Sequence, residues 1–304
     1  MSAELIDEIV RSTGIQKRSL IEKDLKIHGT LRHLSLDPWF RESFLFKGGT
    51  CLIKGFLGYH RFSEDVDFTY KEQSDFEGLS GKRVRDELST IIDKLGVLFE
   101  EIAEPENFQF KCDKGDRNFV EPGGSNRFCT FKIWYGEGAA RSFIKAQFNF
   151  VEKLCFQSKK VEMKTFMKPS EELIRVYPEA KSYFEPVSLP VYDPKEILCE
   201  KVRAILTRRG IKARDFLDVY LLKEKMGLDV ENEFECASIK ISFMLEYYEN
   251  YRENLEAKKQ LLETESLFEW GNERDLLLIQ IDEAKFYNYV ERIEGTLKKL
   301  SKRY

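Results

Sequence analysis

Two aspartates separated by one valine, Asp65 and Asp67, are the side chains of this sequence best suited to chemistry. Val66 and Phe68 alternate with them, which is the period of a β-strand, so both carboxylates are expected to project from one face. Like charges that close disfavour each other's ionisation, and a divalent cation removes the conflict. Mg²⁺ is usually held by one or two carboxylates together with substrate phosphates. The pair predicts a site for Mg²⁺ or Mn²⁺, although an isolated Asp-x-Asp is more often two solvated aspartates on an edge strand.

A Gly-Gly-Thr step, residues 48–50, follows the short apolar run "FLF" and predicts a strand that turns sharply into a helix. Thr50 is expected near the helix N-terminus, where its hydroxyl can cap free backbone N–H groups. Glycines let the main chain approach an anion, and a helix N-terminus carries positive partial charge. The alternative is a plain strand-to-helix turn. A phosphate-binding turn followed by a metal-binding strand would hold a nucleoside triphosphate at both ends.

A second group of charged residues lies far downstream, where cations stand close to two acids. Asp215 and Asp218 are three residues apart and therefore neighbours on one helix face. The cations could offset the charge of a triphosphate; alternatively, these are surface helices with ordinary charge pairing. The cations are Lys201, Arg208, Arg209, Lys212 and Arg214.

The elements that must position these groups change in type along the chain. Helical periodicity predicts two helical segments in residues 2–36, broken near Gly14, and an amphipathic helix over residues 79–95. The runs "VLFEEI", "NFQFKC", "RFCTFKIWY" and "SFIKAQFNFVE" predict strands, and the proline-containing residues 183–194 predict a connector. From residue 195 the pattern is almost wholly helical. The fold class is therefore α+β, with an α/β domain at 1–190 and a helical domain at 191–304.

The bulk composition fits a soluble protein with local rather than global charge. A net charge of −4 gives no overall attraction to nucleic acid, so any polyanion contact needs a local basic patch. The six cysteines have no short paired spacing, which favours buried thiols in a reducing compartment over disulfides or a zinc site. No apolar run approaches membrane-spanning length, and the first residues do not resemble a signal peptide. We expect a cytoplasmic protein without membrane contact.

Several of these motifs occur together in a known family. "GGT" followed by "RFSEDVDF" resembles the turn and Asp-x-Asp strand of the polymerase-β-like nucleotidyltransferases. "IEKD", "LFKGGTCLIKG" and "RFSEDVDF" resemble, more narrowly, the AbiEii/AbiGii branch, whose members are toxins of toxin–antitoxin or phage-abortive systems and include the MenT enzymes. "CEKVRAILTRRGIKARDFLDVYLL" is similar to the second signature of that branch. The two signatures span roughly residues 20–222.

The resemblance implies a nucleotidyltransferase fold and a role for each matched residue. Asp65 and Asp67 would bind the metal, and Lys201 and Asp215 would be needed for catalysis. The implied reaction transfers a nucleoside monophosphate from an NTP to an RNA acceptor, the 3′ end of tRNA, with release of pyrophosphate and restraint by a cognate antitoxin. The residues implied to contact the nucleotide are Gly48, Gly49, Thr50, Ser63, Arg208 and Arg214, whereas Asp218 matches the last acid of the signature with a less defined role.

One position departs from the family pattern. Related enzymes usually carry a third carboxylate on a later strand, where this sequence has Gln147, and glutamine neither acts as a base nor binds Mg²⁺ well. Either Asp215 or Glu152 supplies the third acid, or turnover is weak. Two alternatives stay open: a catalytically weakened nucleotide-binding regulator of the same fold, and an Asp-x-Asp-x-Thr phosphatase with Asp65 as nucleophile and Asp67 as acid–base.

Overall fold

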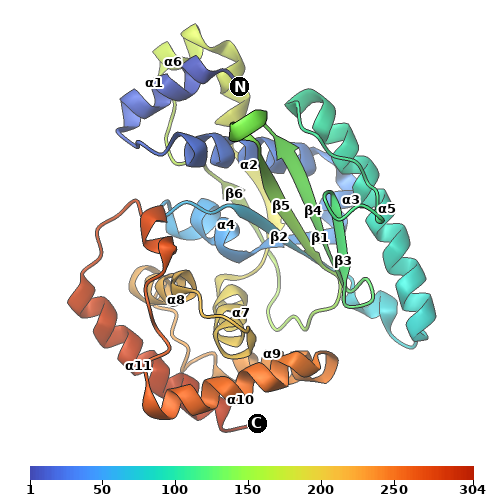
Figure 1. Cartoon of the computed structure of the whole chain (residues 1–304), viewed down its shortest axis with the longest axis vertical. Helices are drawn as coiled ribbons and strands as arrows, with labels where there is room; N and C mark the ends of the chain where they lie inside the picture. Colours follow the sequence, from blue (N-terminus) through green and yellow to red (C-terminus); the bar gives the residue numbers. More distant parts are fainter. The chain divides into compact units, whose positions relative to one another are not determined.

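The computed structural model describes residues 1–304, which form two compact units (Figure 1). The first, here the sheet unit, comprises Met1–Gly58, Phe62–Val151 and Lys159–Val191. The second, the helical unit, comprises Tyr59–Arg61, Glu152–Ser158 and Tyr192–Tyr304. The helical unit thus includes two short segments that the sequence analysis assigns to the first domain.

The sheet unit is built on one mixed sheet of seven strands in the order β3-β4-β5-β2-β1-β7-β6. Two neighbouring pairs, β2 with β5 and β1 with β7, are parallel, and the others are antiparallel. The two strands with the chemistry-bearing residues, β1 and β2, lie in the interior of the sheet. The strands are β1 (Phe44–Lys47), β2 (Asp65–Tyr70), β3 (Val120–Gly123), β4 (Phe128–Tyr135), β5 (Ser142–Asn149), β6 (Lys159–Met163) and β7 (Val187–Val191).

Aromatic side chains form the core beneath β2. The rings of Phe68 in β2 and Phe148 in β5 stack at 5.4 Å between centroids. Phe40 and Phe99, from two different helices, pack edge-on against this pair. The helices of this unit are α1 (Ala3–Thr13), α2 (Arg18–Leu36), α3 (Pro38–Ser43), α4 (Gly48–Leu52), α5 (Gly81–Glu106) and α6 (Glu171–Val176). Because the core holds one face of β2, its alternate residues, including both aspartates, belong to the other face.

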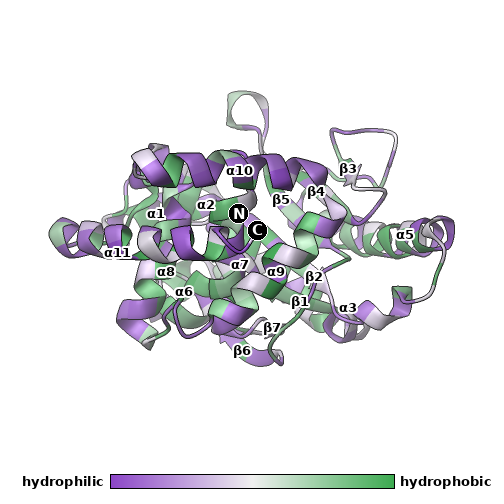
Figure 2. Ribbon diagram, turned by 90° about the horizontal axis from the view of Figure 1, so that it is seen from below, coloured by the Kyte–Doolittle hydropathy of each residue, from purple (hydrophilic) through white to green (hydrophobic).

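The helical unit contains five further helices and no strand of the sheet. They are α7 (Pro194–Thr207), α8 (Ala213–Met226), α9 (Phe234–Tyr247), α10 (Glu249–Thr264) and α11 (Glu283–Ser301). Figure 2 shows hydrophilic and hydrophobic residues alternating around α5 and α10, as expected of amphipathic helices. None of the helices combines the length and hydrophobicity that crossing a bilayer requires.

The structure confirms the α+β class and most of the predicted elements. The break between α1 and α2 falls at Gly14, which has a φ of 73° and caps α1. The prediction of a strand at residues 97–102 was wrong, because α5 continues through them. Phe99 and Ile102 continue the buried face of α5. An apolar run this short is compatible with the period of a strand and with that of a helix.

Two further predictions of secondary structure were wrong. "NFQFKC" forms no strand, although Gln109 makes an isolated bridge to Trp134. The predicted connector at residues 183–194 contains β7, in which Val187, Leu189 and Val191 are buried in alternation. The prolines suggested a connector, but these apolar residues follow the period of a strand and form β7.

Candidate active site

The register of β1 against β2 brings the glycine turn to the aspartates. Lys47, the last residue of β1, pairs with Asp67, so Gly48 follows directly beside that carboxylate. Gly48 has a φ of 75°, in the left-handed region that favours glycine. A Cβ at this position would overlap the carboxylate of Asp67. Only glycine therefore allows the main chain of the turn to approach the second aspartate this closely.

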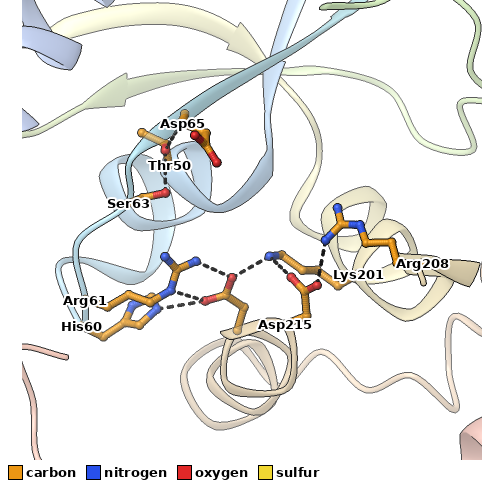
Figure 3. Close-up of polar contacts among 9 residues, drawn as sticks. Thr50, His60, Arg61, Ser63, Asp65, Lys201, Arg208 and Asp215 are labelled. Carbon is orange, nitrogen blue, oxygen red and sulfur yellow. Dashed lines mark hydrogen bonds and ion pairs between the residues drawn. The ribbon is translucent and has the colours of Figure 1, made fainter. Parts of the chain in front are cut away.

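The turn leads directly into α4, and its threonine serves a different purpose from the one predicted. Lys47 is the N-cap residue of α4, and its side chain does not cap the first-turn N–H groups. The prediction that Thr50 caps these groups was wrong. Its buried hydroxyl hydrogen-bonds the carbonyl oxygen of Asp65 and lies 2.8 Å from Oγ of Ser63 (Figure 3). Thr50 and Ser63 thereby tie the start of α4 to the start of β2.

The two aspartates share one face of β2 with residues of β5. In the parallel pairing Asp65 lies opposite Lys145, and Asp67 lies opposite Gln147. Directly paired residues project from the same face, so Gln147 is the neighbour of Asp67 where the family pattern expects an acid. Both aspartates are only half-buried. Two carboxylates on one face, with a main-chain turn against one of them, form a donor set that fits a divalent cation and a phosphate.

Two residues of the "IEKD" and "LIKG" motifs form a buried ion pair that supports this turn. Lys54 Nζ lies 2.9 Å from Asp24 Oδ2, and the side chains of both are at most 2% exposed. Lys54 belongs to the π turn Ile53–Leu57, which continues α4. A more exposed pair joins Lys23 to Glu64 at 3.0 Å, just before β2. Helix α2 therefore anchors both the end of the turn's helix and the approach to β2.

In the helical unit, Asp218 is the centre of a buried network of charges. Its carboxylate accepts hydrogen bonds from Arg61 through Nε at 3.1 Å and Nη2 at 2.7 Å, and it lies 3.1 Å from His60 Nε2 (Figure 3). Lys201 Nζ approaches the same carboxylate at 2.8 Å. Backbone pairing reinforces the contact, because Leu278 N–H donates to the carbonyl oxygen of His60 at 2.9 Å. The segment that immediately precedes Ser63 in the chain is thus held by the helical unit.

Lys201 links Asp218 to the other acid of the signature, Asp215. Its Nζ lies 2.6 Å from Asp215 Oδ1, and Arg208 Nη1 donates to Asp215 Oδ2 at 3.0 Å. Burial alone would raise the pKa of the Asp215 carboxyl, but Lys201 and Arg208 outweigh it and hold the pKa below its ordinary value. Burial opposes Arg61 and Lys201 in the same way at Asp218, whose pKa lies well below the ordinary value. Both acids are ionised, and Lys201 is shared between them.

The remaining predicted site residues have different environments. Arg208 keeps 40% of its side chain exposed while it binds Asp215. Arg209 and Lys212 are exposed in the segment between α7 and α8, and Arg214 is half-buried. Glu152, a candidate for the third acid, is 2% exposed and lies 3.4 Å from Lys240 Nζ within the helical unit. Its carboxylate is therefore committed to a buried ion pair.

Sequence reasoning missed His60 and Arg61. Arg61 is 1% exposed, and its partner Asp218 lies 157 positions along the chain. The one available signal was an arginine directly before the Ser-Glu-Asp-x-Asp motif, and nothing in its spacing indicated a distant carboxylate.

A mixed sheet with a Gly-Gly turn against an Asp-x-Asp strand defines the class of this protein as a nucleotidyltransferase. The chain matches the family model of the nucleotidyl transferase AbiEii toxin, type IV toxin–antitoxin system, over residues 30–297. It belongs to that family of nucleotidyltransferase toxins. This assignment excludes the phosphatase alternative.

The fold has relatives among solved structures. MenT4, a nucleotidyltransferase toxin from Mycobacterium tuberculosis, is 18% identical and aligns over 98% of this chain and 89% of its own, with a TM-score of 0.55. JHP933 from Helicobacter pylori is 13% identical over 93% of this chain and 94% of its own, with a TM-score of 0.41. No curated protein matches the chain in a sequence search. At 18% identity the likeness to MenT4 shows the fold alone.

We predict that Gly48→Ala abolishes nucleotide binding, because its Cβ would displace the Asp67 carboxylate. Gly78→Ala is the matched control, since Gly78 has a φ of 73° and nothing lies within 4 Å of a Cβ there. Both variants should lose about 1–2 kcal/mol of stability from backbone strain in a denaturant titration. If Gly48→Ala binds nucleotide as tightly as Gly78→Ala does, the close approach of the Gly48 main chain to the Asp67 carboxylate is contradicted.

We predict that Asp218→Asn destabilises the folded protein by about 3–5 kcal/mol at neutral pH, because Arg61 and Lys201 stay buried without their anion. The depressed pKa of Asp218 means that its stabilisation is fully present above the ordinary value of 3.8 and is lost as the pH falls toward the folded-state value. The difference in unfolding free energy between the natural protein and Asp218→Asn should therefore be constant above about pH 4 and become smaller below it. If this difference instead grows as the pH falls, the ionised form of Asp218 is not the form that stabilises the protein.

Proposed function

We propose that this enzyme transfers a nucleoside monophosphate from an NTP to the 3′ end of tRNA, with release of pyrophosphate and dependence on Mg²⁺. The observation that carries the proposal is the direct approach of the Gly48 main chain to the Asp67 carboxylate. A turn that binds phosphate and a strand that binds metal are useful together only when one ligand carries both a phosphate chain and a cation. A nucleoside triphosphate with Mg²⁺ is such a ligand.

In this proposal the sheet unit holds the triphosphate. The backbone N–H groups of Gly48, Gly49 and Thr50 face the phosphates at the start of α4. Asp65 and Asp67 hold the Mg²⁺, or Mn²⁺ in its place. A cation bound there supplies stabilisation of the charge that develops on the phosphates during transfer. The hydroxyls of Thr50 and Ser63 stay inside and fix the turn rather than binding the substrate.

The helical unit, taken by itself, offers positive charge to a phosphate in this proposal. Arg208 has one Nη group on Asp215 and 40% of its side chain exposed, which leaves donors for a phosphate. Arg214 is half-buried in the first turn of α8, one residue before Asp215. Lys201 and Asp215 are positioning residues: their 2.6 Å contact fixes the carboxylate that orients Arg208. Loss of either residue should lower activity, because Arg208 would no longer be held in its orientation.

The RNA acceptor and the antitoxin follow from the family rather than from a contact of this chain. Membership of a toxin family supports growth inhibition as the outcome of activity and a cognate antitoxin as the partner that restrains it. The exposed cations Arg209 and Lys212, between α7 and α8, give an RNA phosphate a place to bind.

We predict that Asp65→Asn and Asp67→Asn each lower nucleotidyl transfer at least about 100-fold, as removal of one electrostatic partner of a developing charge does. Purified protein is incubated with Mg²⁺, total tRNA and each α-phosphate-labelled NTP, and label on RNA is measured. Asp86→Asn is the control, because Asp86 is exposed on α5.

Label on no acceptor, from protein that binds nucleotide, would overturn the transfer. Equal growth inhibition by the natural protein and by the Asp65→Asn, Asp67→Asn double variant would instead favour the alternative of a weakened nucleotide-binding regulator.

We predict that Gln147→Asp raises the transfer rate, by up to about 100-fold, because a carboxylate beside Asp67 could accept the proton of the attacking hydroxyl. Gln147→Asn, which adds no charge, should not raise it. The new carboxylate should also lower the melting temperature without Mg²⁺ and increase the gain in melting temperature when Mg²⁺ is added. An unchanged rate with an unchanged Mg²⁺ response would place the base elsewhere.

A further inference from the structure

Three of the six cysteines gather in the helical unit, although they are far apart in the sequence. Cys155 lies in the segment Glu152–Ser158, Cys199 in α7 and Cys236 in α9. Cys155 Sγ lies 4.0 Å from the carbonyl oxygen of Cys236, and Cys199 Sγ lies 3.7 Å from the carbonyl oxygen of Glu233. The expectation of thiols outside any ligand cluster was wrong for Cys155 and Cys236, which lie close to a buried carboxylate. Spacing could not reveal the cluster, because 81 positions separate Cys155 from Cys236.

A buried carboxylate completes the cluster. The sulfurs of Cys155 and Cys236 and a carboxylate oxygen of Glu196 all lie within 4.8 Å of one another. Glu196 is 1% exposed, and its Oε2 accepts hydrogen bonds from the backbone N–H groups of Cys155 at 2.9 Å and Phe156 at 2.8 Å. Hydrogen bonds of this kind orient carboxylate ligands in metal sites. The carboxylate is thus held in place beside the two sulfurs.

We propose that Cys155, Cys236 and Glu196 form a Zn²⁺ site, with sulfur ligands from the two cysteines and an oxygen ligand from the carboxylate. Two thiolate sulfurs and a carboxylate oxygen are ligand types that Zn²⁺ binds, and three protein ligands leave one tetrahedral position for water. The thiols release their protons to solvent as the metal binds, and no oxidation state changes.

The surrounding charges favour a cation at this point. Lys240 Nζ lies 2.5 Å from Glu196 Oε1 and is the cation that Zn²⁺ would compete with. Lys240 keeps other partners if Glu196 turns to a metal, since its Nζ also lies 3.4 Å from Glu152 Oε1 and donates to the carbonyl oxygen of Lys153 at 2.9 Å. Bound Zn²⁺ would join the segment Glu152–Ser158 to α7 and α9.

A disulfide accounts for the cluster less well than a metal does. It would join the sulfurs of Cys155 and Cys236 and would leave the adjacent Glu196 carboxylate without a part in the bond. It would also require an oxidant, which nucleotidyl transfer does not supply.

The test is a titration of the metal-free, full-length protein with ZnCl₂ in competition with a chromogenic chelator. We expect one Zn²⁺ per chain, and Cys155→Ser and Cys236→Ser should each weaken binding at least about tenfold. Cys112→Ser is the matched control, because Cys112 is half-buried like Cys155 but belongs to the sheet unit. Co²⁺ in place of Zn²⁺ should give a thiolate-to-metal charge-transfer band that Cys155→Ser reduces.

A second measurement needs no variant and covers the case in which the substitutions prevent folding. Alkylation of the natural protein is followed residue by residue, with and without Zn²⁺. Zn²⁺ should protect Cys155 and Cys236 and leave the labelling of Cys112 unchanged. Equal labelling in both conditions, equal Zn²⁺ binding by all variants, or isolation of a Cys155–Cys236 disulfide in place of zinc would each overturn the proposal.

Discussion

The antiparallel pairing of β1 with β2 is the constraint on which the candidate active site depends. It ends at Lys47 opposite Asp67, so the turn that begins at Gly48 starts beside the second aspartate. A shift of one residue would exchange the two faces of β2 and bury both aspartates in place of Val66 and Phe68. The aromatic core prevents that shift, because Phe68 is fully buried between the rings of neighbouring elements. The geometry of a polar site is thus set by hydrophobic packing on the opposite face of the same strand.

Hydrogen bonds and ion pairs then hold the glycine turn and the start of β2 in the positions that the strand register sets. Thr50 ties α4 to the main chain of Asp65, and the buried pair of Lys54 with Asp24 joins the following π turn to α2. Breaking a buried pair of this kind leaves one uncompensated charge and typically costs about 3–5 kcal/mol. The turn is therefore held at both ends. The anion site proposed at this turn would depend on rigid support of this kind, because its backbone N–H groups must be preorganised.

The sequence predicts the local features of this site and misses those that depend on distant partners. The period of two at Asp65–Phe68 and the paired glycines are local signals, and the strand and the strand-to-helix turn that they predict are both present. The family resemblance put Gln147 at the position of the expected third carboxylate, but its pairing with Asp67 could not be predicted, since strand order is not readable from spacing. The pairing of Arg61 with Asp218 could not be predicted, because it joins residues 157 positions apart. The cluster of Cys155, Cys236 and Glu196 could not be predicted for the same reason.

The neighbours of Asp67 in the sheet lack the two functions that a third carboxylate would provide, namely acceptance of a proton and binding of a metal. Lys47 on β1 and Gln147 on β5 add no negative charge beside Asp67. A carboxylate in place of Gln147 would offer a proton acceptor and another metal ligand, but it would add negative charge there. Glutamine keeps the size and polarity of the position while removing the base. In the proposed site, this face of β2 would therefore suit the binding of a nucleotide with its cation better than the rapid removal of a proton.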